Sequence, residues 1–133
     1  PQNPIFTELR AIIVKTVGLA GVLRHVLRPL EDRIRWAFIY GSVARGKEMP
    51  GSDVDLMVIG RVGLADLATP LRRAERQLGR AINITSYDEE EFAKKVAAGH
   101  HFVTTVLAAR KLFLQGDAGE LVKTSGKWAS KAS

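Results

Sequence analysis

Apolar residues recur along this chain with two different spacings, and the change from one to the other marks the predicted elements. Helical spacing predicts helices over residues 4–17, 19–27, 64–78, 89–98 and 101–108, and from about residue 118. Alternating or continuous apolar runs predict strands over residues 33–40, 53–59, 81–87 and 111–114. No internal repeat, low-complexity block or linker divides the pattern. We therefore expect the 133 residues to form one folded unit around one core.

The predicted unit has three parts. Residues 1–30 are expected to form N-terminal helices that pack on the main domain, and residues 31–125 are expected to form that domain. Residues 126–133 are polar and are expected to be a flexible tail. In the first strand, alternation predicts that Ile34, Trp36, Phe38 and Tyr40 share one face.

A polar segment joins the first two predicted strands. It begins with Gly41 and Ser42, directly after the first strand, and ends with Asp53 and Asp55 at the start of the second. Because successive side chains of a strand point to opposite faces, the two aspartates are expected on the same face. Each pair also has an ordinary structural interpretation, since Gly-Ser is a common turn and aspartate often caps a turn.

These residue types suit the binding of a triphosphate with its cation. Glycine lets the backbone approach a phosphate closely, and a serine at a helix start adds a hydroxyl beside free N–H groups. Carboxylates are hard oxygen ligands for Mg²⁺, which proteins usually hold together with phosphate oxygens. The combination of strand, Gly41-Ser42 turn, Asp53 and Asp55 therefore predicts a site for a nucleoside triphosphate and metal.

The amino-acid sequence of this segment resembles the signature of a known superfamily. Gly41-Ser42, ten residues and Asp53-Val-Asp55 are similar to the signature of DNA polymerase beta-like nucleotidyltransferases, whose small members are called minimal nucleotidyltransferases. The resemblance implies an α/β (α+β) fold with a small mixed β-sheet flanked by helices. It also implies Mg²⁺, and transfer of a nucleoside monophosphate from ATP or another triphosphate to a hydroxyl acceptor. Gly41, Ser42 and Arg45 would bind the nucleotide, and Asp53 and Asp55 would hold metal and act in catalysis.

The sequence departs from this superfamily at one catalytic position. The third carboxylate usually lies on the next strand, where this chain has Asn83. Asparagine can ligate a cation through its carbonyl oxygen, but it carries no charge and cannot act as a base. We expect slow transfer unless Asp88 or one of the glutamates at 89–91 replaces the missing group. The chain is thus interpreted as a nucleotidyltransferase or as a catalytically weakened nucleotide-sensing module.

Two partners follow from narrower resemblances. Segments such as 6–10, 79–83 and 87–92 resemble proteins in which a winged-helix DNA-binding domain is fused to a nucleotidyltransferase domain. Minimal nucleotidyltransferases also occur as antitoxins of HEPN-type toxins, which implies a protein partner.

Composition restricts the classes of partner and the cellular location that we expect for this chain. The net charge of +6 favours anionic partners such as nucleotides, nucleic acid or an acidic protein, although a basic surface also serves solubility. Cysteine is absent, which excludes disulfides and thiolate metal sites, and no apolar run approaches the length of a membrane span. We expect a cytoplasmic protein with no membrane contact.

Overall fold

The computed structural model describes residues 18–46 and 52–130, so the helix predicted over residues 4–17 lies outside the described residues. Residues 18–27 are helical and lead into the 3₁₀ helix η1 (Arg28–Arg33), which contains Pro29. The remaining elements are β1 (Ile34–Tyr40), β2 (Val54–Gly60), α2 (Leu64–Leu78), β3 (Ile82–Tyr87), α3 (Glu89–Ala97), α4 (His101–Ala108), β4 (Leu112–Gln115) and α5 (Ala118–Ser130).

The four strands form one mixed sheet in the order β3-β2-β1-β4. β1 is antiparallel to both β2 and β4, whereas β2 and β3 are parallel. A parallel pair needs a long crossover connection, and α2 provides it between β2 and β3. This architecture confirms the predicted α+β fold with a small mixed sheet flanked by helices.

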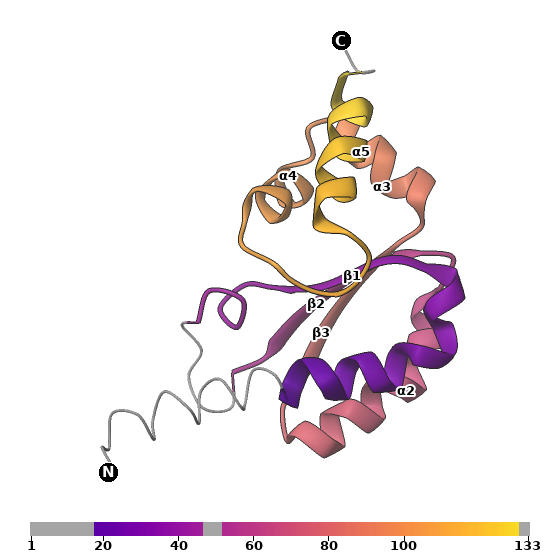
Figure 1. Ribbon diagram of the computed structural model, residues 1–133, viewed down its shortest axis with the longest axis vertical. Coiled ribbons are helices and arrows are strands. Elements are labelled where there is room, and N and C mark those ends of the chain that lie inside the picture. Colours follow the sequence, from indigo (N-terminus) through magenta and orange to yellow (C-terminus); the bar gives the residue numbers. More distant parts are fainter. Residues whose placement is uncertain (1–17, 47–51, 131–133) are drawn as a thin grey trace.

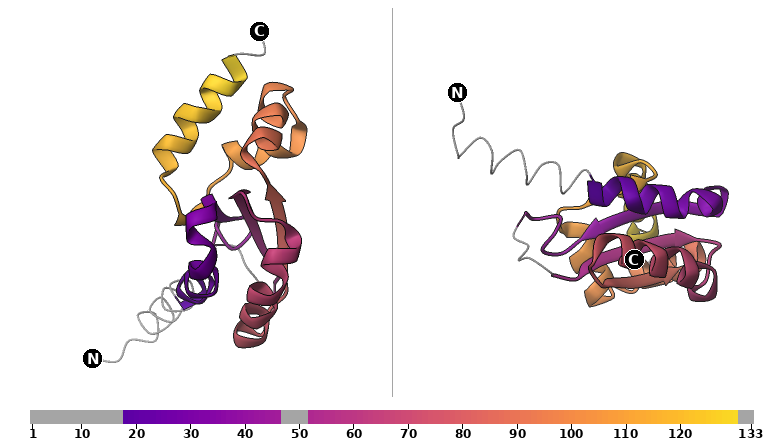
Figure 2. Two further views of the ribbon diagram at one scale, coloured as in Figure 1. Left: turned by 90° about the vertical axis from the view of Figure 1, so that its right-hand side faces the viewer. Right: turned by 90° about the horizontal axis from the view of Figure 1, so that it is seen from below.

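Helices cover both faces of the sheet, as Figures 1 and 2 show. Helix 18–27 and α2 lie side by side on one face, where an aliphatic core includes Leu23, Leu56 and Leu67. Helices α3, α4 and α5 cover the other face, where the core is largely aromatic and includes Trp36 and Phe92. Strands β1 and β2 are buried on both sides, which explains their nearly continuous apolar sequences.

One residue of β1 faces the other way from the prediction. Trp36 and Phe38 belong to the aromatic core, but Ile34 packs in the aliphatic core. The cause is a register shift, since Ile34 pairs with Gly60 while Trp36 pairs with Ile59. A β-bulge inserts one extra residue and so reverses the alternation of side chains beyond it.

The C-terminal segment is helical where a flexible tail was expected from residue 126. α5 continues to Ser130, because Trp128 packs edge-on against two core rings. Its ring centroid lies 6.2 Å from that of Trp36 and 5.8 Å from that of Phe92. The last turns of α5 are largely polar, and the contacts of the Trp128 ring hold them against the core.

Arg35, in β1, forms ion pairs with two of the helices that cover the aromatic core, α3 and α5. Its guanidinium donates to the Glu89 carboxylate at the start of α3 at 2.9 Å, and to that of Glu120 in α5 at 2.8 Å. It also lies 4.2 Å from the ring centroid of Trp36. Within the described residues, no helix is both long enough and apolar enough to cross a membrane.

Candidate nucleotide and metal site

The chain turns sharply where β1 ends. Gly41 has a φ of +77°, a conformation that favours glycine, and its carbonyl accepts from the Arg45 N–H at 3.2 Å. The Gly46 N–H donates to the Val43 carbonyl at 3.1 Å, so residues 41–46 form a compact helical turn. Val43 is buried in the aliphatic core and anchors this turn, while the Arg45 side chain is exposed.

Gly41 lies directly against the carboxylate of Asp55. The register pairs Asp55 with Tyr40, the residue before the glycine. A Cβ atom added to Gly41 would collide with Oδ2 of Asp55. Both the backbone conformation and the close approach therefore require glycine, and the turn brings its backbone next to a carboxylate.

Asp53, Asp55 and Asn83 meet at the end of the sheet where β2 and β3 begin. The parallel register pairs Asp55 with Asn83. The Asn83 Nδ2 atom donates to Asp55 Oδ1 at 3.2 Å and lies 3.4 Å from Asp53 Oδ2. All three side chains reach solvent, since Asp53 and Asn83 are exposed and Asp55 is half-buried.

Two contacts from the end of α2 fix the segment that carries the aspartates. Arg80 Nε donates to the Ser52 carbonyl at 2.8 Å, and the Val54 N–H donates to the Ala81 carbonyl at 2.9 Å. Arg80 lies just beyond the end of α2 and holds the backbone next to Asp53.

Tyr40 is a polar neighbour of Asp55 that the sequence analysis placed only on a face of the first strand. Its hydroxyl shares a hydrogen bond with Thr85, two residues along β3 from Asn83. Burial raises the pKa of Tyr40, and the nearby Asp55 charge raises it further, although the Thr85 bond opposes the change. Tyr40 is therefore neutral near pH 7. Its place as the last residue before Gly41 was the signal in the sequence.

The donor set suits one Mg²⁺ ion shared with phosphate. Two carboxylates lie at the start of β2, both reach solvent, and the Gly41 backbone approaches one of them closely. Proteins commonly bind Mg²⁺ through one or two carboxylates, with substrate phosphates and water completing the shell. No group of three or more His, Cys, Asp or Glu side chains with metal-binding geometry occurs in the described part of the chain.

The acidic segment after β3 does not replace the third carboxylate. Asp88 is separated from Asn83 by the length of β3, roughly 16 Å for five strand residues. There it caps α3, because its Oδ1 accepts from the Glu91 N–H at 2.7 Å, while Glu89 pairs with Arg35. The alternative in which Asp88 or residues 89–91 replace the third carboxylate is wrong, because β3 carries them to the opposite end of the sheet.

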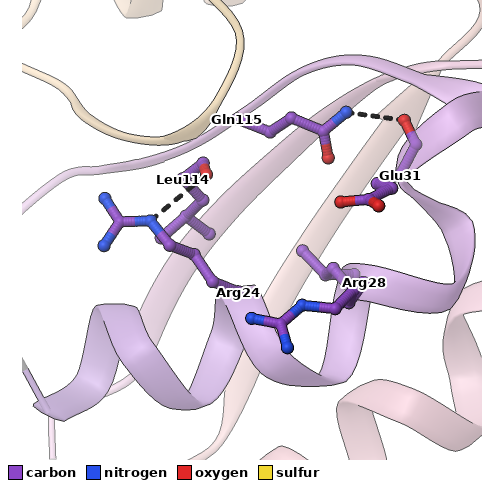
Figure 3. A pocket seen from close by; sticks show the side chains of 6 residues that line it. Arg24, Arg28, Glu31, Leu114 and Gln115 are labelled. Atoms are coloured by element: carbon purple, nitrogen blue, oxygen red, sulfur yellow. Dashed lines mark hydrogen bonds between the residues drawn. The ribbon is translucent and has the colours of Figure 1, made fainter.

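Two hollows lie away from these residues. One, of about 160 Å³, is lined by helix 18–27, η1 and β4 (Figure 3), and there Arg24 donates to the Leu114 carbonyl and Gln115 to that of Glu31. The other, of about 600 Å³, contains Arg61 and Asp88 at the far end of the sheet. Neither is lined by Gly41, Asp53 or Asp55. In the first hollow, the hydrogen bonds of Arg24 and Gln115 connect helix 18–27 and η1 to β4, an edge strand of the sheet.

The adjacent residues His100 and His101 lie at the start of α4. The His100 ring accepts from the Val103 N–H through Nδ1 at 3.4 Å and caps α4, as expected for a helix start. His101 is exposed in the first turn of α4.

Comparison with solved structures shows the same fold in several chains. One in a toxin–antitoxin with AMP-PNP is 12% identical, with a TM-score of 0.61, covering 84% of this chain and 85% of its own. One in the toxin–antitoxin MntA–HepT is 10% identical, with a TM-score of 0.55 and coverages of 85% and 83%. One in the complex of a tri-AMPylated Shewanella oneidensis HEPN toxin with an MNT antitoxin is 11% identical, with a TM-score of 0.53 and coverages of 87% and 85%.

Comparison with curated protein sequences gives no match. Neither the three structures nor the family match below supports the expected winged-helix fusion. The sequence model for polymerase beta nucleotidyltransferases matches residues 23–104, which is more than half of the chain and includes Gly41, Ser42, Asp53, Asp55 and Asn83. This chain belongs to the polymerase beta nucleotidyltransferase family.

Proposed function

We propose that the chain binds a nucleoside triphosphate with Mg²⁺ where β1 ends and β2 and β3 begin. The observation that carries this proposal is the contact of Gly41 with the Asp55 carboxylate. A phosphate lying over the glycine turn would be next to any cation held by Asp53 and Asp55. That arrangement joins the two parts of a metal–triphosphate complex in one place.

Each residue has a distinct proposed role. The backbone at Gly41 and the hydroxyl of Ser42 would bind phosphate oxygens, and the exposed Arg45 side chain would contact the same group. Asp53 and Asp55 would hold Mg²⁺, which when bound neutralises phosphate charge. ATP is the first nucleotide to test, because a similar fold has been crystallised with its analogue AMP-PNP.

The reaction of the family transfers a nucleoside monophosphate. The acceptor oxygen bonds to the α-phosphorus, the bond from that phosphorus to the oxygen bridging it to the β-phosphorus breaks, and pyrophosphate leaves. The acceptor hydroxyl loses its proton to a base. Asn83 cannot accept that proton, and Tyr40 is neutral. Transfer by this chain is therefore expected to be slow, and nucleotide sensing without turnover is the alternative activity at the same site.

A protein hydroxyl is the proposed acceptor. Chains of similar fold occur in toxin–antitoxin complexes, and one of those complexes contains an AMPylated HEPN toxin. The second candidate function is accordingly that of an antitoxin that binds a HEPN-type partner. Labelled ATP incubated with the chain and a protein encoded beside it would show whether label appears on that partner.

Calorimetry with ATP and Mg²⁺ tests the primary proposal. The unmodified chain is expected to bind, and Asp53→Asn with Asp55→Asn is expected to weaken binding at least tenfold, about 1.4 kcal/mol. The matched control is Asp32→Asn with Glu90→Gln, which also removes two negative charges but at the far end of the sheet. Equal binding by the two double variants, or none by the unmodified chain, would disprove the proposal.

A further inference from the structure

Asn83 spans the two aspartates through its amide nitrogen. Its Nδ2 atom is 3.2 Å from Asp55 Oδ1 and 3.4 Å from Asp53 Oδ2. Ionised carboxylates can only accept hydrogen bonds, so the NH₂ group of the amide, and not its oxygen, must face them. The side chain thus presents two N–H donors to the pair of carboxylates.

This orientation conflicts with a second metal ion. An ion bridging Asp53 and Asp55 on the Asn83 side would meet the N–H groups, whose hydrogens carry partial positive charge. Rotating the amide would present its oxygen instead, but both hydrogen bonds to the carboxylates would be lost. The rotated oxygen would also supply no negative charge to offset a second divalent cation.

The surrounding residues add no compensating charge. Tyr40, which pairs with Asp55 across the sheet, and Thr85, two residues beyond Asn83, are neutral and bond to each other. Asp88 lies at the far end of β3 and caps α3. Glu75 also reaches the start of β3, but its carboxylate accepts from the Ile82 N–H at 2.8 Å. Within residues 18–46 and 52–130, no third carboxylate joins Asp53 and Asp55 in a group that could hold a metal.

We propose that the site takes one divalent cation, carried with the triphosphate, and that the Asn83 amide occupies the place of the second cation used in two-metal transfer. This inference rests on the proposed nucleotide binding and makes it more specific. A single ion would position the triphosphate, but no ion would remain to activate an acceptor hydroxyl. The bound nucleotide would then act as a persistent ligand and turn over slowly.

Counting bound Mn²⁺ tests the inference without relying on activity. The probe is an ATP analogue with a methylene group between the α- and β-phosphorus atoms, because transfer would cleave the natural bond there. Free Mn²⁺ is measured by electron paramagnetic resonance at saturating analogue, and analogue binding is measured separately by calorimetry. The unmodified chain is expected to bind about one Mn²⁺ per analogue, and Asn83→Asp about two.

Two further variants control the experiment. Asn83→Ala removes the amide without adding a carboxylate and is expected to bind about one Mn²⁺. Gln77→Glu adds a negative charge on the exposed side of α2 and is expected to leave the count unchanged. Circular dichroism checks that each variant is folded.

The outcomes separate this inference from the proposed function. Two Mn²⁺ ions on the unmodified chain, or one on a folded Asn83→Asp variant that binds the analogue, would overturn the inference alone. Failure of the unmodified chain to bind the analogue would overturn the proposed function, and the inference with it. The count on the unmodified chain decides the matter even if Asn83→Asp does not fold.

Discussion

Gly41 shows how strongly a single position can constrain the candidate site. Its positive φ is one constraint, and its contact with the Asp55 carboxylate is another. Gly46, five residues later, also has a positive φ of +69°, but a Cβ atom there would meet nothing within 4 Å. A comparison of substitutions at the two glycines therefore distinguishes the effect of a positive φ from the effect of the contact with Asp55.

Alanine substitution at these glycines should give different results. Each of Gly41→Ala and Gly46→Ala places a Cβ in the left-handed region, which costs about 1–2 kcal/mol of stability. Only Gly41→Ala also pushes the Asp55 carboxylate aside, so only that variant should lose ATP–Mg²⁺ binding. Urea unfolding measures the first effect and calorimetry the second. Equal nucleotide binding by both variants would contradict the proposed role of the Gly41 contact.

At the scale of elements, sequence pattern was most successful where one periodicity decided the outcome. The amphipathic helix over residues 64–78 was predicted at the bounds that α2 has. Strand parity predicted a shared face for Asp53 and Asp55, and the Asn83 Nδ2 atom lies within 3.4 Å of an oxygen of each. The length of β3, which places Asn83 and Asp88 at opposite ends of that strand, was not considered in the sequence prediction.

The remaining differences have causes that local pattern does not contain. The bulge at Ile34 depends on how β1 pairs with β2, which is a long-range property. The last turns of α5 depend on Trp128 meeting Trp36 and Phe92, residues distant in sequence. Tertiary contacts outweighed local propensity in both places.

The end of α5 offers a direct measure of that packing. Trp128→Ala should destabilise the chain by about 2 kcal/mol, because the ring contacts two core aromatics. Val122→Ala, in the same helix but 70% exposed, should change stability by less than about 0.5 kcal/mol. Chemical denaturation compares them. Equal effects would show that the end of α5 contributes no packing energy.

The start of α2 gives a prediction about pH. Asp66 accepts from the Gly63 N–H and pairs with Arg33, each at 3.0 Å, and these contacts lower the pKa of Asp66. Because the folded state then holds its proton less tightly than the unfolded state, the stabilisation is present above the ordinary aspartate pKa of about 4. It is lost as the pH falls through the lower, folded-state value.

Asp66→Asn should therefore reduce the acid dependence of unfolding. Urea unfolding of both proteins at a series of pH values between about 2 and 6 measures this. The stability of the unmodified chain should fall more steeply with acidification than that of the variant. Parallel curves would show that the Asp66 contacts do not persist in solution.

On the scale of the whole molecule, the small sheet has edge strands whose outer groups are bonded by neighbouring elements. At β4, Arg24 donates to the Leu114 carbonyl (Figure 3) and also to the Phe113 carbonyl. At β3, the Ile82 N–H donates to the Glu75 carboxylate at 2.8 Å. Such contacts occupy groups that would otherwise be available for pairing with another chain.

Removing the Arg24 contacts should weaken the fold and expose the β4 edge. Arg24→Met keeps an apolar stem but loses the donors, and should cost about 1 kcal/mol. Arg28→Met, at the exposed start of η1, removes the same charge and should cost less than about 0.5 kcal/mol. Thermal unfolding and light scattering compare the two. Greater loss or more aggregation with Arg28→Met would contradict the role of Arg24.

The Asn83 amide also has a genetic consequence. Asparagine and aspartate codons differ only in their first base, so a single transition restores the third carboxylate of the family at a backbone position that already pairs with Asp55. Any large population carrying this gene produces that variant repeatedly. Loss of such cells from the population would indicate selection for stable nucleotide binding, whereas their spread would indicate selection for transfer.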